Sequence, residues 1–183
     1  MSQVINIDNT IKLRPTTLAD ARFIFDAFST QGNYLRQWLP ISADFNTVID
    51  VEDYIEMSEA EETYNFTIEY KGDMAGIISI SHISFANRRA EIGYWLTKPL
   101  QGNGIMVRSV KAIVEYAFSK LNMNRLEIKC APENLRSRQI PIKLGFKLEG
   151  VEREGEKSAD GLFNDLEVYS LLKNDFPQKN INH

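Results

Sequence analysis

Two glycines near the middle of the chain mark the first stretch with residue types suited to chemistry. The sequence Gln101-Gly102-Asn103-Gly104 separates an apolar stretch ending at Leu96 from a new apolar run that begins at Ile105. Glycines at the start of a helix leave backbone N–H groups and the positive end of the helix dipole open to an anion such as a phosphate. The alternative is a plain tight turn in which glycine supplies a positive φ angle. The spacing by itself leaves both interpretations open.

Two named phosphate motifs are excluded by the residues that follow the glycines. A Walker loop ends in Gly-Lys-Ser/Thr, whereas Gly104 is followed by Ile105 and Met106. The dinucleotide fingerprint requires a third glycine at the position of Val107. The sequence therefore supports neither nucleotide hydrolysis nor a nicotinamide cofactor.

The cysteine and the histidines carry little chemistry of their own. Cys130 is the single cysteine, so it forms no internal disulfide, and the sequence shows no histidine or cation that would activate it as a nucleophile. We read it as a small apolar filler. His82 and His183 form no ligand cluster, so no metal is predicted, and His82 is interpreted as an ordinary strand residue.

Hydrophobic periodicity indicates the elements that must position these residues. A strand at 11–14 leads into a helix that begins near Thr17 and ends near Gln31, and an acidic helix follows at 48–62. Its predicted inner face consists of Val51, Tyr54, Ile55 and Met57. The remaining predicted elements are a hairpin at 64–83, a strand at 88–96, a helix at 105–121, a strand at 124–132, a helix at 133–146, and two closing strands around a turn at 158–161.

Length and composition place the chain among ordinary globular proteins. It has 183 residues, 43% of them hydrophobic and 25% charged, which suits one globular domain. The order of the predicted elements indicates an α/β domain with a mixed, mostly antiparallel sheet of about seven strands and helices on both faces. The net charge of -4 argues against a general nucleic-acid binder. The start lacks signal-peptide features and no apolar run approaches the ~20 residues that cross a bilayer, so we expect a cytoplasmic protein without a membrane partner.

Three motifs in order resemble one enzyme family. The segment Gln101–Gly104, between a strand carrying EIGYWL and an amphipathic helix, is similar to the pyrophosphate loop of the GNAT acyl-CoA-dependent N-acetyltransferases, although Met106 replaces the usual small residue at the end of that motif. Asn134-x-x-Ser137 before LGFKLEG, together with NYLRQWLP at 33–40, resembles the RimJ/RimL-type branch, in which Met at that position is common. The likeness covers about residues 10–172 of a single acetyltransferase domain spanning 1–183, with 177–183 as a flexible tail.

The resemblance implies acetyl-CoA as the cofactor, with its pyrophosphate on the glycine loop. Its pantetheine arm would lie along the strand that ends at 96 and be positioned by Asn134, and a strand N–H near Gly93 would polarise the thioester. The fold would splay the strands at 88–96 and 124–130 into a slot where thioester and amine meet. The implied cofactor-binding residues are Tyr94, Trp95, Leu96, Gln101, Gly102, Asn103, Gly104, Ile105, Met106, Val107 and Asn134.

The same resemblance supplies candidates for proton transfer. Ser137, one helical turn after Asn134, would donate a proton to the leaving thiolate, with helix capping as the alternative role. Glu156 and Glu91 compete as the base that takes the amine proton. Glu91 stands in a strand whose burial would raise its pKa, and Glu156 lies where the branch carries an acidic residue facing the substrate. Ordinary surface carboxylates, or a water relay, are the alternatives.

The acceptor is left open by these motifs. Tyr34, Leu35, Arg36 and Trp38 would wall its site, unless this aromatic cluster is plain core. The branch implies a protein N-terminal amine, such as that of a ribosomal protein, and is compatible with a homodimer. Two hypotheses compete with this one. In the first, the enzyme acetylates a small-molecule amine such as a polyamine or an aminoglycoside. In the second, the protein is a non-catalytic acyl-CoA-binding module. An open groove favours a peptide, and a narrow closed pocket favours a small molecule.

Overall fold

The computed structural model describes residues 3–39, 45–158 and 161–176, apart from the side chains at positions 32 and 33. The strands are β1 (Ile5–Asn6), β2 (Ile11–Pro15), β3 (Tyr64–Tyr70), β4 (Asp73–Ser84), β5 (Arg89–Leu96), β6 (Arg125–Cys130), β7 (Lys147–Lys157) and β8 (Phe163–Leu172). The helices are η1 (Leu18–Asp20), α1 (Ala21–Thr30), α2 (Gly32–Arg36), α3 (Val48–Ala60), η3 (Lys98–Leu100), α4 (Ile105–Ser119) and α5 (Leu135–Lys143). They correspond closely to the predicted order of elements.

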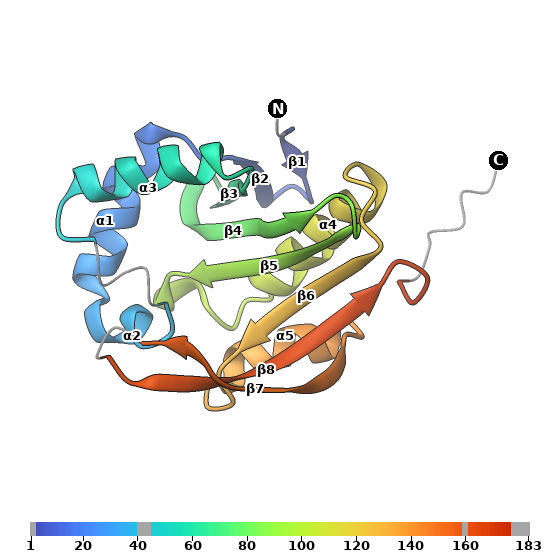
Figure 1. Ribbon diagram of the computed structural model, residues 1–183. Coiled ribbons are helices and arrows are strands. Elements are labelled where there is room, and N and C mark those ends of the chain that lie inside the picture. Colours follow the sequence, from blue (N-terminus) through green and yellow to red (C-terminus); the bar gives the residue numbers. More distant parts are fainter. Residues whose placement is uncertain (1–2, 40–44, 159–160, 177–183) are drawn as a thin grey trace.

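The strands form one sheet in the order β1-β2-β3-β4-β5-β6-β8-β7 (Figure 1). All neighbouring strands are antiparallel except β5 and β6, which are parallel and joined through α4. The mixed, mostly antiparallel sheet is therefore confirmed. The strand beyond the seven predicted segments is β1, which has two residues and is too short to give a period-two pattern.

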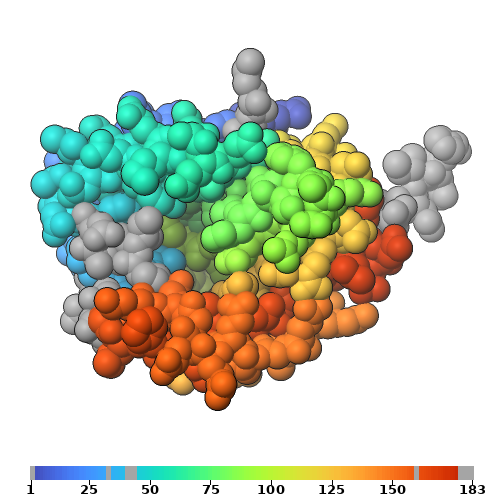
Figure 2. Space-filling view, viewed as in Figure 1, coloured from blue at the N-terminus to red at the C-terminus, as the bar shows by residue number. Residues whose placement is uncertain are grey.

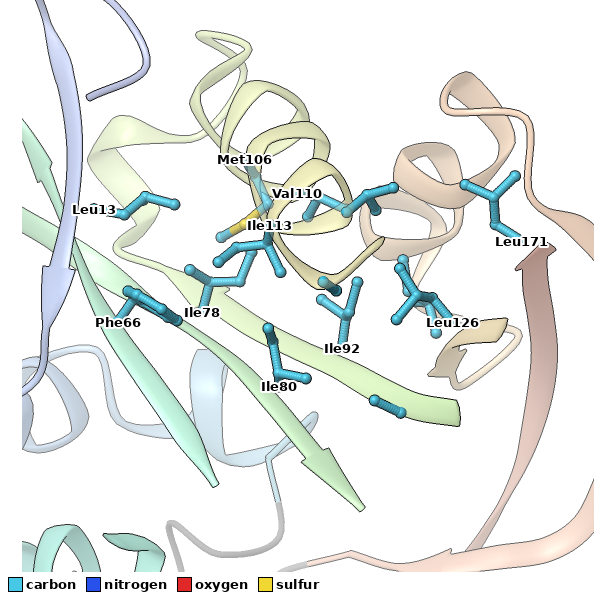
Figure 3. Close-up of a cluster of buried hydrophobic side chains, with 14 of the residues drawn as sticks. Leu13, Phe66, Ile78, Ile80, Ile92, Met106, Val110, Ile113, Leu126 and Leu171 are labelled. Atoms are coloured by element: carbon cyan, nitrogen blue, oxygen red, sulfur yellow. The ribbon is translucent and has the colours of Figure 1, made fainter. Parts of the chain in front are cut away.

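Helix α4 packs against one face of the sheet, and the larger core lies between them (Figure 3). The apolar positions of α4 recur at the helical period, which predicts a buried stripe on one side, and its members within the helix are all buried: Met106, Val110, Ile113, Val114, Ala117 and Phe118. Figure 3 shows Met106, Val110 and Ile113 of α4 in this core together with labelled residues of the strands, which are Leu13, Phe66, Ile78, Ile80, Ile92, Leu126 and Leu171. Helix α5 contacts α4 and β6. The Asn134–Ser137 segment, which forms the start of α5, therefore lies beside these two elements.

Helices α1 and α3 cover the opposite face over a second, smaller core. Phe28 of α1 makes an edge contact with Trp95 of β5, their ring centroids 5.1 Å apart. The predicted inner face of α3 is wrong at Met57, which is 61% exposed, whereas Ser58 is buried. Ser58 tolerates burial because its hydroxyl donates to the carbonyl oxygen of Tyr54 at 2.8 Å, so no polar group is left unpaired.

The parallel pair at the centre of the sheet separates after a few residues. Pairing between β5 and β6 runs from Arg89 with Arg125 to Glu91 with Glu127 and then stops. The remaining parts of the two strands, from Ile92 and from Ile128 onward, are not paired with each other. This separation produces the predicted slot through the sheet, and the glycine loop follows at the end of β5.

Parts of three predictions lie outside the described residues. These are Pro40 at the end of the 33–40 motif, positions 159 and 160 of the 158–161 turn, and the tail at 177–183.

Candidate active site

A cavity of about 620 Å³ occupies the slot between β5 and β6. Its lining comes from α2, β5, the glycine loop, the first turn of α4, the end of β6, α5 and the β7–β8 hairpin. Figure 2 shows the corresponding face hollowed between the cyan-to-green α3–β4 part and the orange β7–β8 hairpin. The three predicted catalytic residues, Ser137, Glu156 and Glu91, all line this one cavity.

The glycine loop uses the conformational freedom of its two glycines. Gly102 and Gly104 have φ angles of 83° and 69°, in the left-handed region that other residues adopt at a cost. A Cβ atom at either position would meet no atom of the chain within 4 Å, so the loop also faces open space. The tight-turn interpretation and the anion interpretation are therefore compatible, because the same glycines satisfy both.

The start of α4 has no side chain that caps it. Gly104 is the N-cap residue, and the first hydrogen bond of the helix runs from the Arg108 N–H to the Gly104 carbonyl at 3.2 Å. The N–H groups of residues 105–107 precede that bond, and these residues line the cavity. Asn103 does not line it, since its amide donates to the carbonyls of Leu100 and Gln101 and closes the turn.

Gln101 connects three elements around the cavity. Its Nε2 donates to the Leu96 carbonyl at 2.9 Å, and its Oε1 accepts from the Tyr34 hydroxyl at 2.7 Å. The same Oε1 accepts from Nη1 of Arg136 at 2.6 Å. The side chain predicted to bind cofactor is thus engaged with the protein itself.

Tyr94 and Ser137 meet on the α5 side of the slot. Asn134 caps α5 by accepting from the Ser137 N–H at 3.2 Å, which holds the serine in the first helical turn. The Tyr94 and Ser137 hydroxyls lie 3.2 Å apart, and the Tyr94 hydroxyl also donates to the Ser137 carbonyl at 3.3 Å. Burial raises the pKa of Tyr94 far above its usual value, so the phenol remains protonated.

Cys130 lies at the end of β6 and lines the same cavity. It is a buried free cysteine, and burial raises the pKa of its thiol to about 11, with the nearby Glu167 charge adding to the shift. A thiol that remains protonated near neutral pH is a poor nucleophile. The geometry agrees with the prediction of an apolar filler.

Glu156 enters the cavity from β7 through an irregular stretch of strand. Residues Glu152 to Glu156 of β7 are opposite only Leu166 to Asn164 of β8, so β7 carries extra residues at this point. Glu154 within that bulge has a φ angle of 53°. A bulge can redirect a side chain. Glu156 is the one residue of β7 that is partly buried, whereas the other residues of the strand are exposed. Burial, and secondarily the charge of Glu91, raise the pKa of Glu156.

Glu91 of β5 lies near Lys129 and His82. Its Oε2 lies 3.7 Å from Nζ of Lys129 and 3.8 Å from Nδ1 of His82. Lys129 also pairs with Glu152 at 2.9 Å. His82 lies within strand β4, as the sequence suggested, at an irregularity where its φ angle is 49° and its side chain is 78% exposed.

A second hollow adjoins the first over the paired part of β5 and β6, since Arg89, Glu91, Arg125 and Glu127 line it. Its volume is also about 620 Å³, and it shares Glu91, Lys129, Glu156 and Leu166 with the slot cavity. Apart from the shared residues and from Ala90, Gly155 and Val168, it is lined by polar and charged side chains of β4 to β7. They are His82, Arg89, Arg125, Glu127, Glu149 and Glu152. We refer to these two adjacent hollows together as the extended groove.

The predicted acceptor wall is only partly in the cavity. Tyr34, Leu35 and Trp38 line it, but Arg36 does not, because its Nη2 is directed to the Phe45 carbonyl at 3.3 Å. Trp95 lines the cavity while packing on α1, so its ring lies on the face opposite α4.

The sequence missed several polar residues of the cavity. The lining also includes Gln37, Lys129, Arg136, Gln139, Lys143 and Asn164. Arg136 lies within the Asn134–Ser137 motif, which gave a signal for it. Lys129 gave none, because a lysine in a strand is usually an exposed residue.

The site suits a phosphorylated acyl carrier. The row of backbone N–H groups, together with Arg136, suits a pyrophosphate. The lining of the same cavity also includes Ser137 and the two carboxylates, Glu91 and Glu156. Within the described residues, no group of three or more histidine, cysteine, aspartate or glutamate side chains is arranged to hold a metal ion. No helix in the described ranges is both long and apolar enough to span a membrane.

Comparison with known proteins identifies the class. Residues 10–147 match the acetyltransferase (GNAT) domain family. The chain is 31% identical over 175 residues to the Bacillus subtilis protein named "Putative ribosomal N-acetyltransferase YdaF", with 93% of this chain and 95% of that protein covered. The chain therefore belongs to the GNAT acetyltransferase family.

Solved structures place it within the family. The structure of Mycobacterium smegmatis RimJ in complex with CoA-disulfide has a TM-score of 0.86 at 25% identity, covering 92% of this chain and 85% of that one. The microcin C7 self-immunity acetyltransferase MccE, in complex with acetyl-CoA and AMP, has a TM-score of 0.84 at 29% identity, covering 92% and 95%. The chain is an acetyl-CoA-dependent N-acetyltransferase of the RimJ/RimL-like branch.

Proposed function

We propose that the acceptor is the N-terminal amine of a protein, of the kind found on ribosomal proteins. The observation that carries this proposal is the extended groove, in which the slot cavity adjoins a second hollow along four shared lining residues. A groove of this shape accommodates an extended chain behind the reactive amine, whereas a compact amine would need only the slot. The name of the Bacillus subtilis relative supports the same class of acceptor.

The residues of the slot divide the work of direct transfer. Acetyl-CoA supplies an activated acetyl thioester. The N–H groups of residues 102–107 and Arg136 bind its phosphates, and Asn134 orients the first turn of α5 toward the slot. Gly93 lies in the part of β5 that is not paired with β6, and it contributes a backbone N–H that polarises the thioester carbonyl.

Proton transfer falls to groups on opposite sides of the slot. Glu156, whose pKa is raised toward the operating range, accepts the proton of the acceptor ammonium. Glu91 holds that ammonium near the slot by its charge, while Lys129 limits the excess of negative charge. Ser137 donates its hydroxyl proton to the leaving sulfur, and the hydroxyl of Tyr94 beside it supports the serine in this position.

The test is thiol release from acetyl-CoA by the purified protein with a panel of acceptors. The panel contains peptides with free N-termini, the same peptides with blocked N-termini, polyamines and aminoglycosides. We expect release with free peptides and not with blocked ones, because the reactive group is the N-terminal amine. Faster release with a polyamine or aminoglycoside than with every peptide would overturn the proposal, and acetyl-CoA binding without turnover on any amine would indicate a binding module.

A polyamine is the second candidate, and the charge of the groove favours it. The second hollow carries the five carboxylates of Glu91, Glu127, Glu149, Glu152 and Glu156, against three permanent cations, Arg89, Arg125 and Lys129. An acceptor with several ammonium groups would therefore be attracted along the groove. A spermidine KM that rises with salt concentration much more steeply than the peptide KM would support this candidate.

A further inference from the structure

Gln101 lies where the cofactor loop meets the proposed acceptor wall. Its amide oxygen accepts two hydrogen bonds, from the Tyr34 hydroxyl and from Arg136, and its amide nitrogen donates to the Leu96 carbonyl. An amide oxygen has two lone pairs, so both are in use. The side chain therefore links β5, α2 and α5 at the residue that directly precedes Gly102 of the glycine loop.

Helix α2 is attached to the same turn by two further contacts. The Lys98 N–H donates to Oε1 of Gln31, immediately before α2, at 2.8 Å. The Lys98 ammonium lies 5.1 Å from the centre of the Tyr34 ring. On its other side α2 is held by Leu35, which is buried in the smaller core. Of these contacts, the one that reaches the residue next to Gly102 is the Tyr34–Gln101 hydrogen bond.

This arrangement ties the position of α2 to the state of the glycine loop. The loop is open on the side where Cβ atoms would stand, and its N–H groups are anchored when an anion lies on them. An anion that restrains the loop also restrains Gln101, the residue before Gly102. Through its hydrogen bond to Gln101, the Tyr34 hydroxyl is then restrained as well. A wall that is ordered before the acceptor arrives binds that acceptor more tightly, since less ordering entropy remains to be lost.

We propose that Tyr34 is a positioning residue that couples occupancy of the cofactor loop to the acceptor wall through Gln101. Tyr34 thereby acts through the loop, beyond the direct substrate contact that the sequence suggested. The inference rests on the proposed function, because it takes α2 to be part of the acceptor wall. Linkage is reciprocal, so a bound acceptor must raise cofactor affinity by the same factor as the cofactor raises acceptor affinity.

Amide hydrogen exchange tests the coupling without using activity. The probe is CoA at saturating concentration, and the variants are Tyr34→Phe and, as a matched control, Tyr70→Phe. Tyr70 lies in β3, outside the cavity lining, and its hydroxyl makes no hydrogen bond within the described residues. In the unmodified protein we expect CoA to slow exchange both at the start of α4 and in α2, the latter by about two- to tenfold, the size of one neutral hydrogen bond.

The two variants then separate the possible outcomes. In Tyr34→Phe, CoA should still slow exchange at the start of α4, but its effect on α2 should disappear, whereas Tyr70→Phe should behave as the unmodified protein. Equal protection of α2 in all three proteins would overturn the coupling. No protection of the α4 start at any CoA concentration would instead contradict the cofactor site on which the proposed function depends.

Binding of a peptide acceptor gives the second readout. The probe is the free peptide with the highest turnover in the panel, and its Kd is measured with and without CoA. We expect CoA to tighten peptide binding about two- to tenfold, and Tyr34→Phe to reduce this factor toward one. In kinetics the same variant should raise the peptide KM while kcat changes less than about twofold. Equal weakening with and without CoA would show that Tyr34 only contacts the peptide, and would overturn the proposal.

Discussion

On the α4–α5 side of the slot, the groups that line the cavity include backbone N–H groups, the α5 cations Arg136 and Lys143, and the neutral hydroxyls of Tyr94 and Ser137, which bond to each other. On the groove side they are carboxylates and cations, with Glu91 near Lys129 and Glu156 at a bulge of β7. The first side is preorganised by local hydrogen bonds. The second side depends on the balance of charges from separate strands, which pH and neighbouring residues shift. Binding and proton transfer should therefore respond to different changes.

The largest expected effect is on the glycine loop. Gly104→Glu places a side chain and a negative charge where the N–H groups of the α4 start bind phosphate, and strains a residue with a φ angle of 69°. We expect acetyl-CoA affinity to fall by at least about 100-fold, or roughly 3 kcal/mol. Isothermal titration measures the change.

Gly72→Glu is the matched control for this substitution. Gly72 has a φ angle of 95° and open space around its missing Cβ, but it lies in the β3–β4 turn and does not line the cavity. It should lose a similar amount of stability and retain acetyl-CoA affinity. Equal loss of affinity in both variants would show that the loop serves folding and not phosphate binding.

On the groove side, Glu156→Gln should lower kcat by about 100-fold with little change in the acetyl-CoA KM, since it removes the base and leaves the loop intact. The same substitution should raise the free energy of unfolding at neutral pH. Burial raises the pKa of Glu156 in the folded state, so its favourable contribution is present below the unfolded pKa and is lost as pH rises through the folded pKa. Chemical denaturation near pH 5 and pH 8 checks the sign, and lower stability of the variant at pH 8 would contradict it.

The charge of Glu91 provides a finer test of the groove side. A base works only when deprotonated, so activity should rise with pH through the pKa of Glu156. Because the Glu91 charge contributes to raising that pKa, Glu91→Gln should move the acidic limb of the kcat/KM profile to lower pH. A limb that remains in place would mean that another group takes the proton.

A smaller effect is expected at the hydroxyl pair. Ser137→Ala should reduce kcat by roughly ten- to a hundredfold, and Tyr94→Phe by roughly two- to tenfold, because the latter removes only one supporting hydrogen bond. Since the two hydroxyls lie 3.2 Å apart, the double variant should be little worse than Ser137→Ala. Fully additive losses in single-turnover rates would separate Tyr94 from the function of Ser137.

The smallest expected effect is at Cys130. Cys130→Ala should keep kcat within about threefold and cost about 1 kcal/mol of stability, as a small buried truncation does. The raised pKa of about 11 also predicts slow alkylation by iodoacetamide at pH 7.5. Rapid alkylation that abolishes activity in the unmodified protein, together with an inactive Cys130→Ala variant, would assign the thiol a direct role.

The elements that the sequence predicted best are long and periodic. The helix starting at Ile105 and the hairpin at 64–83 were recovered because their apolar residues repeat on one face. Met57 was wrongly placed inside because residue type alone favoured it over Ser58, whose hydroxyl finds a partner within its own helix. Such local satisfaction of a polar group does not appear in a hydrophobicity pattern.

Within the site, the sequence was most informative where the residues are neighbours along the chain. The loop at 101–107 and the pair Asn134 and Ser137 each lie within one turn, so spacing alone places them together. Arg136 was missed although it lies within the Asn134–Ser137 motif, whereas Lys129 gave no signal, because a lone lysine on a strand does not indicate that it faces a cavity.

The sequence by itself determined the glycine loop, the helix start behind it and the family, because these depend on short-range backbone geometry and on motifs within a few residues. Only the tertiary structure decided that Glu91 and Glu156 share a cavity, since a separated pair of strands and a bulge in β7 bring them together. It likewise decided that Gln101 bonds to Tyr34 instead of facing solvent. Long-range pairing is set by the packing of the whole sheet, which no local pattern contains.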